Sequence, residues 1–392
     1  MTMTRWWVII FWWLTFTASS QPIREADLLQ RLFELQKLQR PSLLPGIVPS
    51  YVTRKPRMSE AKLNNNIFYN DLLIFTLQNL GPSLSNHKAI VDSIIKYARI
   101  PFDKFVNKKG RGTYNFWRTD SAYTFPYNWW VSVFRNDYAP PDDLDVTALS
   151  MLALASDSSS IASIHSIMQG YVHNGKKSRS VGKRYQSFQF YSSWFGKKFP
   201  VVLDVCVLTN ILCMVEAKKL KWTKADSASL DVIVTAIQNQ DIVRQPLAVS
   251  PYYGKASLLL YHIARLMHVR TIPKLEAQKQ TLCALAVDEF RHSKDLLEKI
   301  ILSIALLKWG YEIPQLVIPE QPELNARIER SNFPFFIGNV SSYLSNGKRV
   351  VLTNLKVGLF YHYCPAWNDV LLLEYLVLMN QRADGNLTQI KN

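Results

Sequence analysis

The chain has 392 residues, of which 48% are hydrophobic and 19% are charged, and this apolar content is enough to bury a large core. Lysine and arginine number 46 against 30 acidic residues. The resulting net charge of +16 predicts attraction to anionic surfaces such as membranes, phosphates or acidic glycans. The basic residues are dispersed in short pairs, which is typical of a solvated surface and does not indicate a specific nucleic-acid partner. Four cysteines are too few for a disulfide framework in a chain of this size.

The first twenty residues have the pattern of a targeting segment. Arg5 precedes an apolar stretch, Trp6–Phe16, that is too short to span a bilayer. The small residues Ala18-Ser19-Ser20 follow, so we expect cleavage before Gln21 and an exported protein, secreted or periplasmic. The alternative is an uncleaved segment whose tryptophans keep the protein at a membrane.

Helical periodicity dominates the remaining chain, and strand alternation is scarce. Glu25–Gln39 has the apolar spacing of an amphipathic helix, and Pro41–Pro56, with four prolines, predicts an extended connector. The further helices that we predict are Asn66–Leu80, His87–Ala98, Asp145–Ala155, Ser160–Tyr171, Val201–Ala217, Lys224–Gln240, Pro251–His268, Lys274–Asp288, Ser293–Trp309 and Trp367–Asn380.

These elements predict an all-α protein with one main domain. Helices joined by short loops over this length are typical of stacked helix pairs. We expect a signal peptide at 1–20, a helix and connector at 21–60, the helical domain at 61–385 and a tail at 386–392.

An acidic turn, Pro140–Asp145, precedes one of the predicted helices. Proline suits the first turn of a helix, and aspartate accepts hydrogen bonds from the free amides there. Asp142 or Asp143 is therefore expected to cap the helix, with Asp145 as a first-turn charge. The same carboxylates could instead bind a cation or ligand, or supply a proton.

Blocks of sequence in a fixed order resemble bacterial proteins of the terpenoid cyclase/protein prenyltransferase superfamily. The resemblance implies an α/α toroid, in which inner and outer helices alternate around a central apolar cavity and the inner helices begin at one mouth. The blocks are Thr113-Tyr114-Asn115-Phe116-Trp117, Pro141-Asp142-Asp143-Leu144-Asp145, Phe199-Pro200 leading to Asp204 and Asn210, and Pro251-Tyr252-Tyr253 leading to Leu260-Tyr261-His262.

The acidic turn also resembles the Asp-x-Asp-Asp-Thr-Ala motif of cyclases that start by protonation. The resemblance implies that Asp145 protonates an alkene or epoxide with help from Asp143. Val146 stands where the motif has its third acid. A proton donor must be held neutral in a dry site, whereas a helix N-terminus favours the ionised carboxylate.

Protein prenyltransferases of the same superfamily bind zinc with an Asp-x-Cys pair and a later histidine that follows a tyrosine. The resemblance implies Asp204, Cys206 and His262 as the corresponding ligands; the segment Tyr361–Cys364 also carries a histidine after a tyrosine. Residues two apart on a helix do not share a face, and cysteine in an apolar helix is commonly a buried hydrophobe. We therefore expect no zinc and no other cofactor.

A loop rich in aromatic residues runs from Gly110 to Pro141. Aromatic rings stabilise carbocations in cyclases, stack on sugars in glycan-binding clefts, or simply close a core. The residues that we expect near a cavity mouth are Trp117, Tyr123, Trp129, Trp130, Trp194 and Tyr253.

Three functions remain open from the sequence. The first is a cyclase-like or prenyltransferase-like toroid acting on an apolar isoprenoid or lipid, with Asp145 as acid. The second is a non-catalytic toroid that binds a lipid, glycan or protein. The third is a glycan-degrading toroid, which needs two carboxylates across a cleft, with Asp145 and Asp204 as candidates. The sequence has no glycine-rich phosphate loop, Gly-x-Ser-x-Gly elbow or His-Glu-x-x-His helix.

Overall fold

The structure of the protein is a computed structural model. It describes residues 23–38, 41–120, 141–176, 178–196, 199–320 and 323–385. Of this part of the chain, 57% is helical. No helix in it is long and apolar enough to cross a membrane. The expected signal peptide lies outside the described residues.

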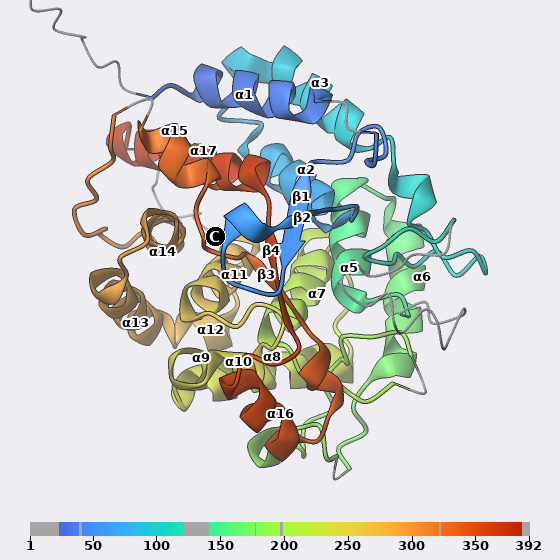
Figure 1. The fold of residues 1–392 in the computed structure, drawn as a ribbon. Helices are drawn as coiled ribbons and strands as arrows, with labels where there is room; N and C mark the ends of the chain where they lie inside the picture. The colour runs from blue at the N-terminus through green and yellow to red at the C-terminus, as the bar shows by residue number, and fades with distance from the viewer. Residues whose placement is uncertain are drawn as a thin grey trace, which may run out of the picture.

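Six of the described helices form a closed inner ring. Each packs against the next in chain order, and the last packs against the first. Figure 1 shows the elements arranged around a centre, with the chain colour passing from blue through green and orange to red. The fold is therefore the expected α/α toroid. The inner helices are α2 (Phe68–Leu80), α5 (Leu144–Ala153), α7 (Val205–Ala217), α11 (Ala256–Val269), α14 (Leu296–Lys308) and α17 (Pro365–Ala383).

Other helices surround this ring. α1 packs on α17 and α3, α3 packs on α2, and α8, α13 and α15 pack on α7, α14 and α17 respectively. The longer outer helices are α1 (Glu25–Lys37), α3 (Lys88–Ala98), α6 (Ser158–Met168), α8 (Lys224–Gln238), α13 (Lys279–His292) and α15 (Glu323–Glu329). The shorter helices are α9 (Asp241–Arg244), α10 (Pro246–Val249), α12 (Pro273–Glu276) and α16 (Asn346–Asn354).

The two sets of helices differ in the width of their apolar surface. In α5 every residue is buried, whereas the fully buried positions of α3 are Val91, Ile94 and Ala98, which follow one helical face. A helix that is apolar all round must be enclosed by others, and a helix with one apolar stripe covers them. The distribution of apolar residues around each helix therefore indicates whether the helix lies in the inner ring or outside it.

A small antiparallel sheet, which the sequence analysis did not predict, accompanies the toroid. Its strand order is β2-β1-β4-β3, and Tyr51 pairs with Tyr363 while Phe336 pairs with His362. β1 forms within the stretch predicted as an extended connector. The strands are β1 (Ser50–Thr53), β2 (Lys62–Asn64), β3 (Phe336–Asn339) and β4 (Leu359–Tyr363).

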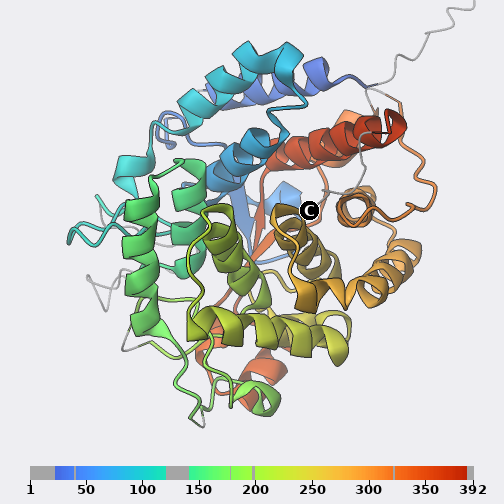
Figure 2. The same cartoon turned by 180° about the vertical axis from the view of Figure 1, so that it is seen from behind.

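The sheet lies at the end of the toroid where inner helices begin. β4 leads through Cys364, the N-cap residue, directly into α17. The amide of Ile337 in β3 donates to the carbonyl of Tyr252, 2.7 Å away, just before α11. The sheet stands in front of the ring in Figure 1 and behind the helices in Figure 2. We call this end the mouth.

Candidate active site

Two aspartates at the mouth begin two neighbouring inner helices. Asp143 is the N-cap of α5 and accepts a hydrogen bond from the amide of Val146 at 2.5 Å. Asp204 is the N-cap of α7 and accepts from the amides of Cys206 and Val207 at 2.9 and 3.2 Å. Capping satisfies amides that have no partner in the first helical turn. Both carboxyl groups are thereby fixed in position.

Asp145, the acid implied by the cyclase resemblance, is enclosed by hydrogen-bond donors. The Tyr253 hydroxyl and the Asn210 side-chain amide each donate to one of its oxygens at 2.5 Å. Burial raises the pKa of Asp145, while these two donors and the nearby Arg265 act in the opposite direction. Both oxygens thus already serve the protein as acceptors.

Asp143 has a different environment from Asp145. It is buried, and the hydrogen bonds that its side chain accepts within the described structure come from the backbone. Burial, followed by the neighbouring charge of Asp145, raises the pKa of Asp143 well above its ordinary value. The backbone amides of Val146 and Asp145 act in the opposite direction. Asp143 is therefore held by backbone amides, whereas Asp145 is held by the side chains of Tyr253 and Asn210.

Asp142, the third acid of the turn, forms an ion pair. Its Oδ2 accepts from Arg111 Nη2 at 2.5 Å and from Asn107 Nδ2 at 2.6 Å, and it also bonds with the Thr113 hydroxyl. The Arg111 guanidinium lies 5.2 Å from the centre of the Phe195 ring. The three acids of one short segment therefore differ in hydrogen bonding, although their sequence suggests one cluster.

Asp204 lies at the same mouth, and its carboxyl group is held in place by several hydrogen bonds. Besides capping α7, it accepts from the Ser250 hydroxyl at 2.5 Å and from the Tyr252 amide at 2.9 Å. Burial raises the pKa of Asp204 to about 7. Because Tyr252 and Tyr253 are consecutive, the segment before α11 ties Asp204 and Asp145 to one another. The structure thus brings together the two carboxylates expected for a glycan-degrading toroid, with their oxygens engaged by the protein.

The residues implied as zinc ligands do not fit that role. No group of three histidine, cysteine or acidic side chains capable of holding a metal occurs among the described residues. Asp204 is occupied by four donors, and burial raises the pKa of the Cys206 thiol well above its ordinary value. His262 Nδ1 lies 2.7 Å from the Leu258 carbonyl, and its ring packs 4.5 Å from that of Tyr253. In the alternative segment, the ring of His362 packs against those of two phenylalanines.

The described aromatic candidates lie at or beside the mouth. The backbone of Trp194 forms an isolated antiparallel β-bridge with that of Asp143. The Trp194 indole donates a hydrogen bond to the Tyr252 hydroxyl at 2.8 Å. The Trp117 ring packs 4.9 Å from that of Phe116. The other expected residues, Tyr123, Trp129 and Trp130, lie outside the described residues.

Phe336, which the sequence analysis missed, is the central aromatic residue of the mouth. Its ring centre lies 5.0 Å from that of Phe68, 5.1 Å from Phe116 and 5.7 Å from Tyr253. Phe336 belongs to β3, a four-residue strand far along the chain from these partners. No local pattern marks such a residue, because its role depends on where the sheet docks.

The interior of the ring carries polar and charged side chains, in contrast to the apolar cavity that the resemblance implied. Arg265 bonds with Asn210, which holds Asp145, and lies 5.6 Å from the ring centre of Tyr261. Arg265 is one of the functional candidates that sequence reasoning missed. The sequence does contain a signal for Arg265, because a charged residue is unusual within a long apolar helix.

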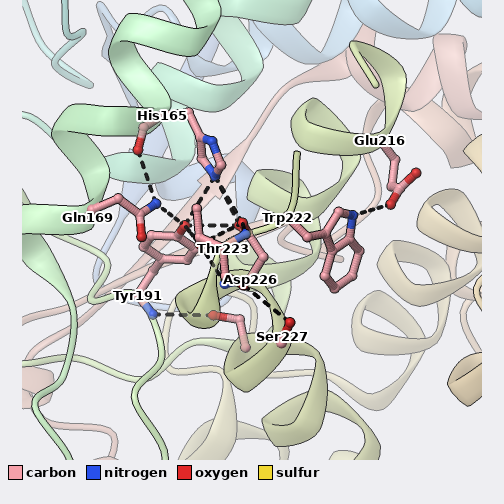
Figure 3. A network of polar contacts seen from close by, with 9 residues as sticks. His165, Gln169, Tyr191, Glu216, Trp222, Thr223, Asp226 and Ser227 are labelled. Carbon is pink, nitrogen blue, oxygen red and sulfur yellow. Dashed lines mark hydrogen bonds and ion pairs between the residues drawn. The ribbon is translucent and has the colours of Figure 1, made fainter. Parts of the chain in front are cut away.

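A second buried polar network joins two outer helices (Figure 3). His165 of α6 lies with Nε2 at 3.1 Å from both carboxylate oxygens of Asp226 in α8, and Tyr191 donates to Asp226 at 2.9 Å. Thr223 caps α8 and forms a capping box with Asp226. The group resembles a catalytic His-Asp pair, but its hydrogen bonds fasten α6, a loop and α8 together.

Comparison with known proteins yields little. The chain matches no known protein-family model. No curated protein matches it in sequence. Among solved structures, the crystal structure of an unsaturated glucuronyl hydrolase specific for heparin is similar at a TM-score of 0.42 and 11% sequence identity, over 92% of this chain and 99% of that chain. Similarity at this level assigns no activity, and the terpenoid cyclase/protein prenyltransferase superfamily stays a prediction. The toroid itself is shown by the closed ring of helices.

Proposed function

We propose that the protein is a glycan-degrading toroid that binds saccharides at its mouth, with Asp143 as the general acid. The observation that carries the proposal is the environment of Asp143: a buried carboxyl group, fixed at the start of α5 next to Trp194, whose pKa burial raises well above its ordinary value. When protonated, Asp143 can donate its proton to the glycosidic oxygen as the bond to the sugar breaks. A water molecule then adds to the anomeric carbon, and one of its protons returns to the Asp143 carboxylate.

The interior of the toroid favours a saccharide over an isoprenoid. A cyclase needs a dry apolar cavity around its substrate, whereas this ring contains the polar chain of Asp145, Asn210 and Arg265. Asp145 is also an unsuitable proton donor, since Tyr253 and Asn210 both donate to it. Aromatic rings beside polar groups suit a sugar, which has apolar faces and hydroxyl edges.

The net charge supports an acidic glycan as substrate. A charge of +16 attracts polyanions. Export, which the targeting segment predicts, would bring the protein to extracellular polysaccharides. We therefore propose acidic extracellular glycans as the first class to test.

The experiment is a cleavage assay on heparin, alginate, pectate and hyaluronan, read as new reducing ends. Asp143→Asn should abolish activity yet fold, because asparagine caps a helix about as well as aspartate. The matched control is Asp157→Asn. Asp157 caps α6 on the exposed outer side, accepting from the amides of Ser159 and Ser160, and its change should leave activity intact. An active Asp143→Asn variant would refute the assignment.

A glycan-binding protein without turnover is the second candidate. It is favoured by Asp145 and Asp204, whose oxygens are already bonded to the protein, so that neither is free to activate a water molecule. Binding of the same four glycans, measured by calorimetry, separates the two functions. Binding that is unchanged in Asp143→Asn, without cleavage by the wild type, would support the second candidate.

A further inference from the structure

Exposed apolar residues are concentrated in one short segment of the chain. Of the large hydrophobic side chains that are exposed in the described structure, more than half lie between residues 340 and 357. Leu355 is 66% exposed, Val351 57% and Val357 51%. Scattered apolar residues are normal on a protein surface, but a cluster marks an interaction site. The α16 patch consists of Val340, Leu344, Val351, Leu355 and Val357.

Among the described side chains of α16, two buried ones are polar and an exposed one, Val351, is apolar. The buried positions of α16 include Arg349 and Thr353, which bond with the Ala248 carbonyl and the Ser341 hydroxyl, each at 3.1 Å. Val351 and Leu355 are offset from these by two residues, about 200° around a helix, and face outward. A helix normally buries its apolar side. The exposed Val351 of α16 and Leu355, its C-cap residue, therefore indicate a partner that is itself apolar.

The charge of the segment identifies the chemistry of that partner. Residues 340–357 contain Lys348, Arg349 and Lys356 but no acidic residue, and both lysines are exposed. A second copy of the chain would bring the same positive charge against this one, which opposes self-association. Apolar side chains flanked by lysines suit the surface of an anionic bilayer. The apolar side chains enter the interface, and the lysines form ion pairs with the anionic headgroups.

We propose that the α16 patch docks the protein on anionic lipid membranes. The proposal does not depend on the reaction at the mouth. Docking through α16 would, however, fix the orientation of the mouth relative to the membrane. Arg349 donates to the Ala248 carbonyl, two residues before Ser250, whose hydroxyl donates to Asp204, so α16 lies at the rim of the mouth. Figures 1 and 2 agree in placing α16 at the periphery on the side of the sheet. Docking through α16 would hold the rim of the mouth beside the bilayer.

The test uses the full chain with an environment-sensitive fluorophore on Leu355→Cys. The native cysteines Cys206, Cys213, Cys283 and Cys364 are all buried, so the introduced thiol reacts selectively. The matched control is the same label on Val317→Cys, an apolar position that is 77% exposed and lies outside the patch. Any contribution of the N-terminal segment to binding is common to both labelled proteins.

The expected result is a blue shift with vesicles of phosphatidylglycerol and phosphatidylcholine for the label at 355 and none for the label at 317. Lys348→Gln with Lys356→Gln should weaken the response roughly 30-fold, which corresponds to about 1 kcal/mol per lysine. An unchanged spectrum at 355, an equal shift at 317, or equal binding to phosphatidylcholine alone would each overturn the proposal. So would a concentration-dependent shift without vesicles, which would indicate a protein partner.

Discussion

Tyr261 of α11 donates a hydrogen bond to Glu374 of α17, with 2.9 Å between the hydroxyl oxygen and Oε2. These two helices are not neighbours in the ring, since α14 lies between them, so the bond crosses the interior. Lys308 of α14 forms an ion pair with the same carboxylate, also at 2.9 Å, and both side chains of the pair are buried. The centre of the toroid is therefore joined by specific polar contacts as well as by apolar packing.

Removing the charge of Glu374 should strongly destabilise the protein. In Glu374→Gln, Lys308 loses its buried partner, and we expect the free energy of unfolding to fall by about 3–5 kcal/mol in urea titrations. The control is Lys274→Gln, which breaks the exposed pair with Asp231 and should cost less than about 1 kcal/mol. Equal losses in the two variants would show that the buried pair contributes no more than a surface contact.

The bond between Tyr253 and Asp145 should be detectable as a coupling energy. Tyr253→Phe and Asp145→Asn are each expected to lower the free energy of unfolding by about 1.5–3 kcal/mol, since the bond involves a buried carboxylate. The double variant should lose less than the sum, because both changes remove one interaction. Strict additivity in this double-mutant cycle would contradict the contact. Stability is measured by denaturant unfolding, alongside cleavage activity.

The network around Asp226 predicts a dependence of stability on pH. His165 and Thr223 outweigh the effect of burial and hold the pKa of Asp226 below its ordinary value. A carboxyl group with a lowered folded-state pKa contributes stability above its unfolded pKa of about 3.9 and loses it as the pH falls through the folded value. The stability difference between the wild type and Asp226→Asn should thus shrink as the pH falls from about 5 through the lowered folded-state pKa of Asp226. A constant difference in urea titrations across that range would argue against this network.

Removal of metal should leave the protein unchanged. Asp204 already accepts four hydrogen bonds, which it would have to give up in order to bind a metal ion. Dialysis against EDTA should therefore leave the melting temperature of the full chain unaltered. A fall that added zinc reverses would restore the metal-site hypothesis.

The positions of helices could be predicted from the sequence because helical signals are local. Apolar spacing within a few turns placed α2, α7 and α14 close to their observed bounds. The acidic turn indicated the start of α5, since a cap acts on amides within three residues of itself. The sheet escaped prediction because its strands have only three to five residues, too few for alternation to stand out.

The chemistry of the mouth was decided by tertiary structure. Asp143 and Asp145 are two residues apart and look equivalent in the sequence. Their difference depends on Tyr253, 108 residues further along the chain from Asp145, which donates to Asp145 alone. Phe336 likewise acquires its place only when β3 docks over the ring. The sequence determined which segments become helices and which faces are apolar. The closure of the ring decided how deeply each carboxyl group is buried and which donors reach it, and burial and distant donors together set the pKa of a carboxyl group.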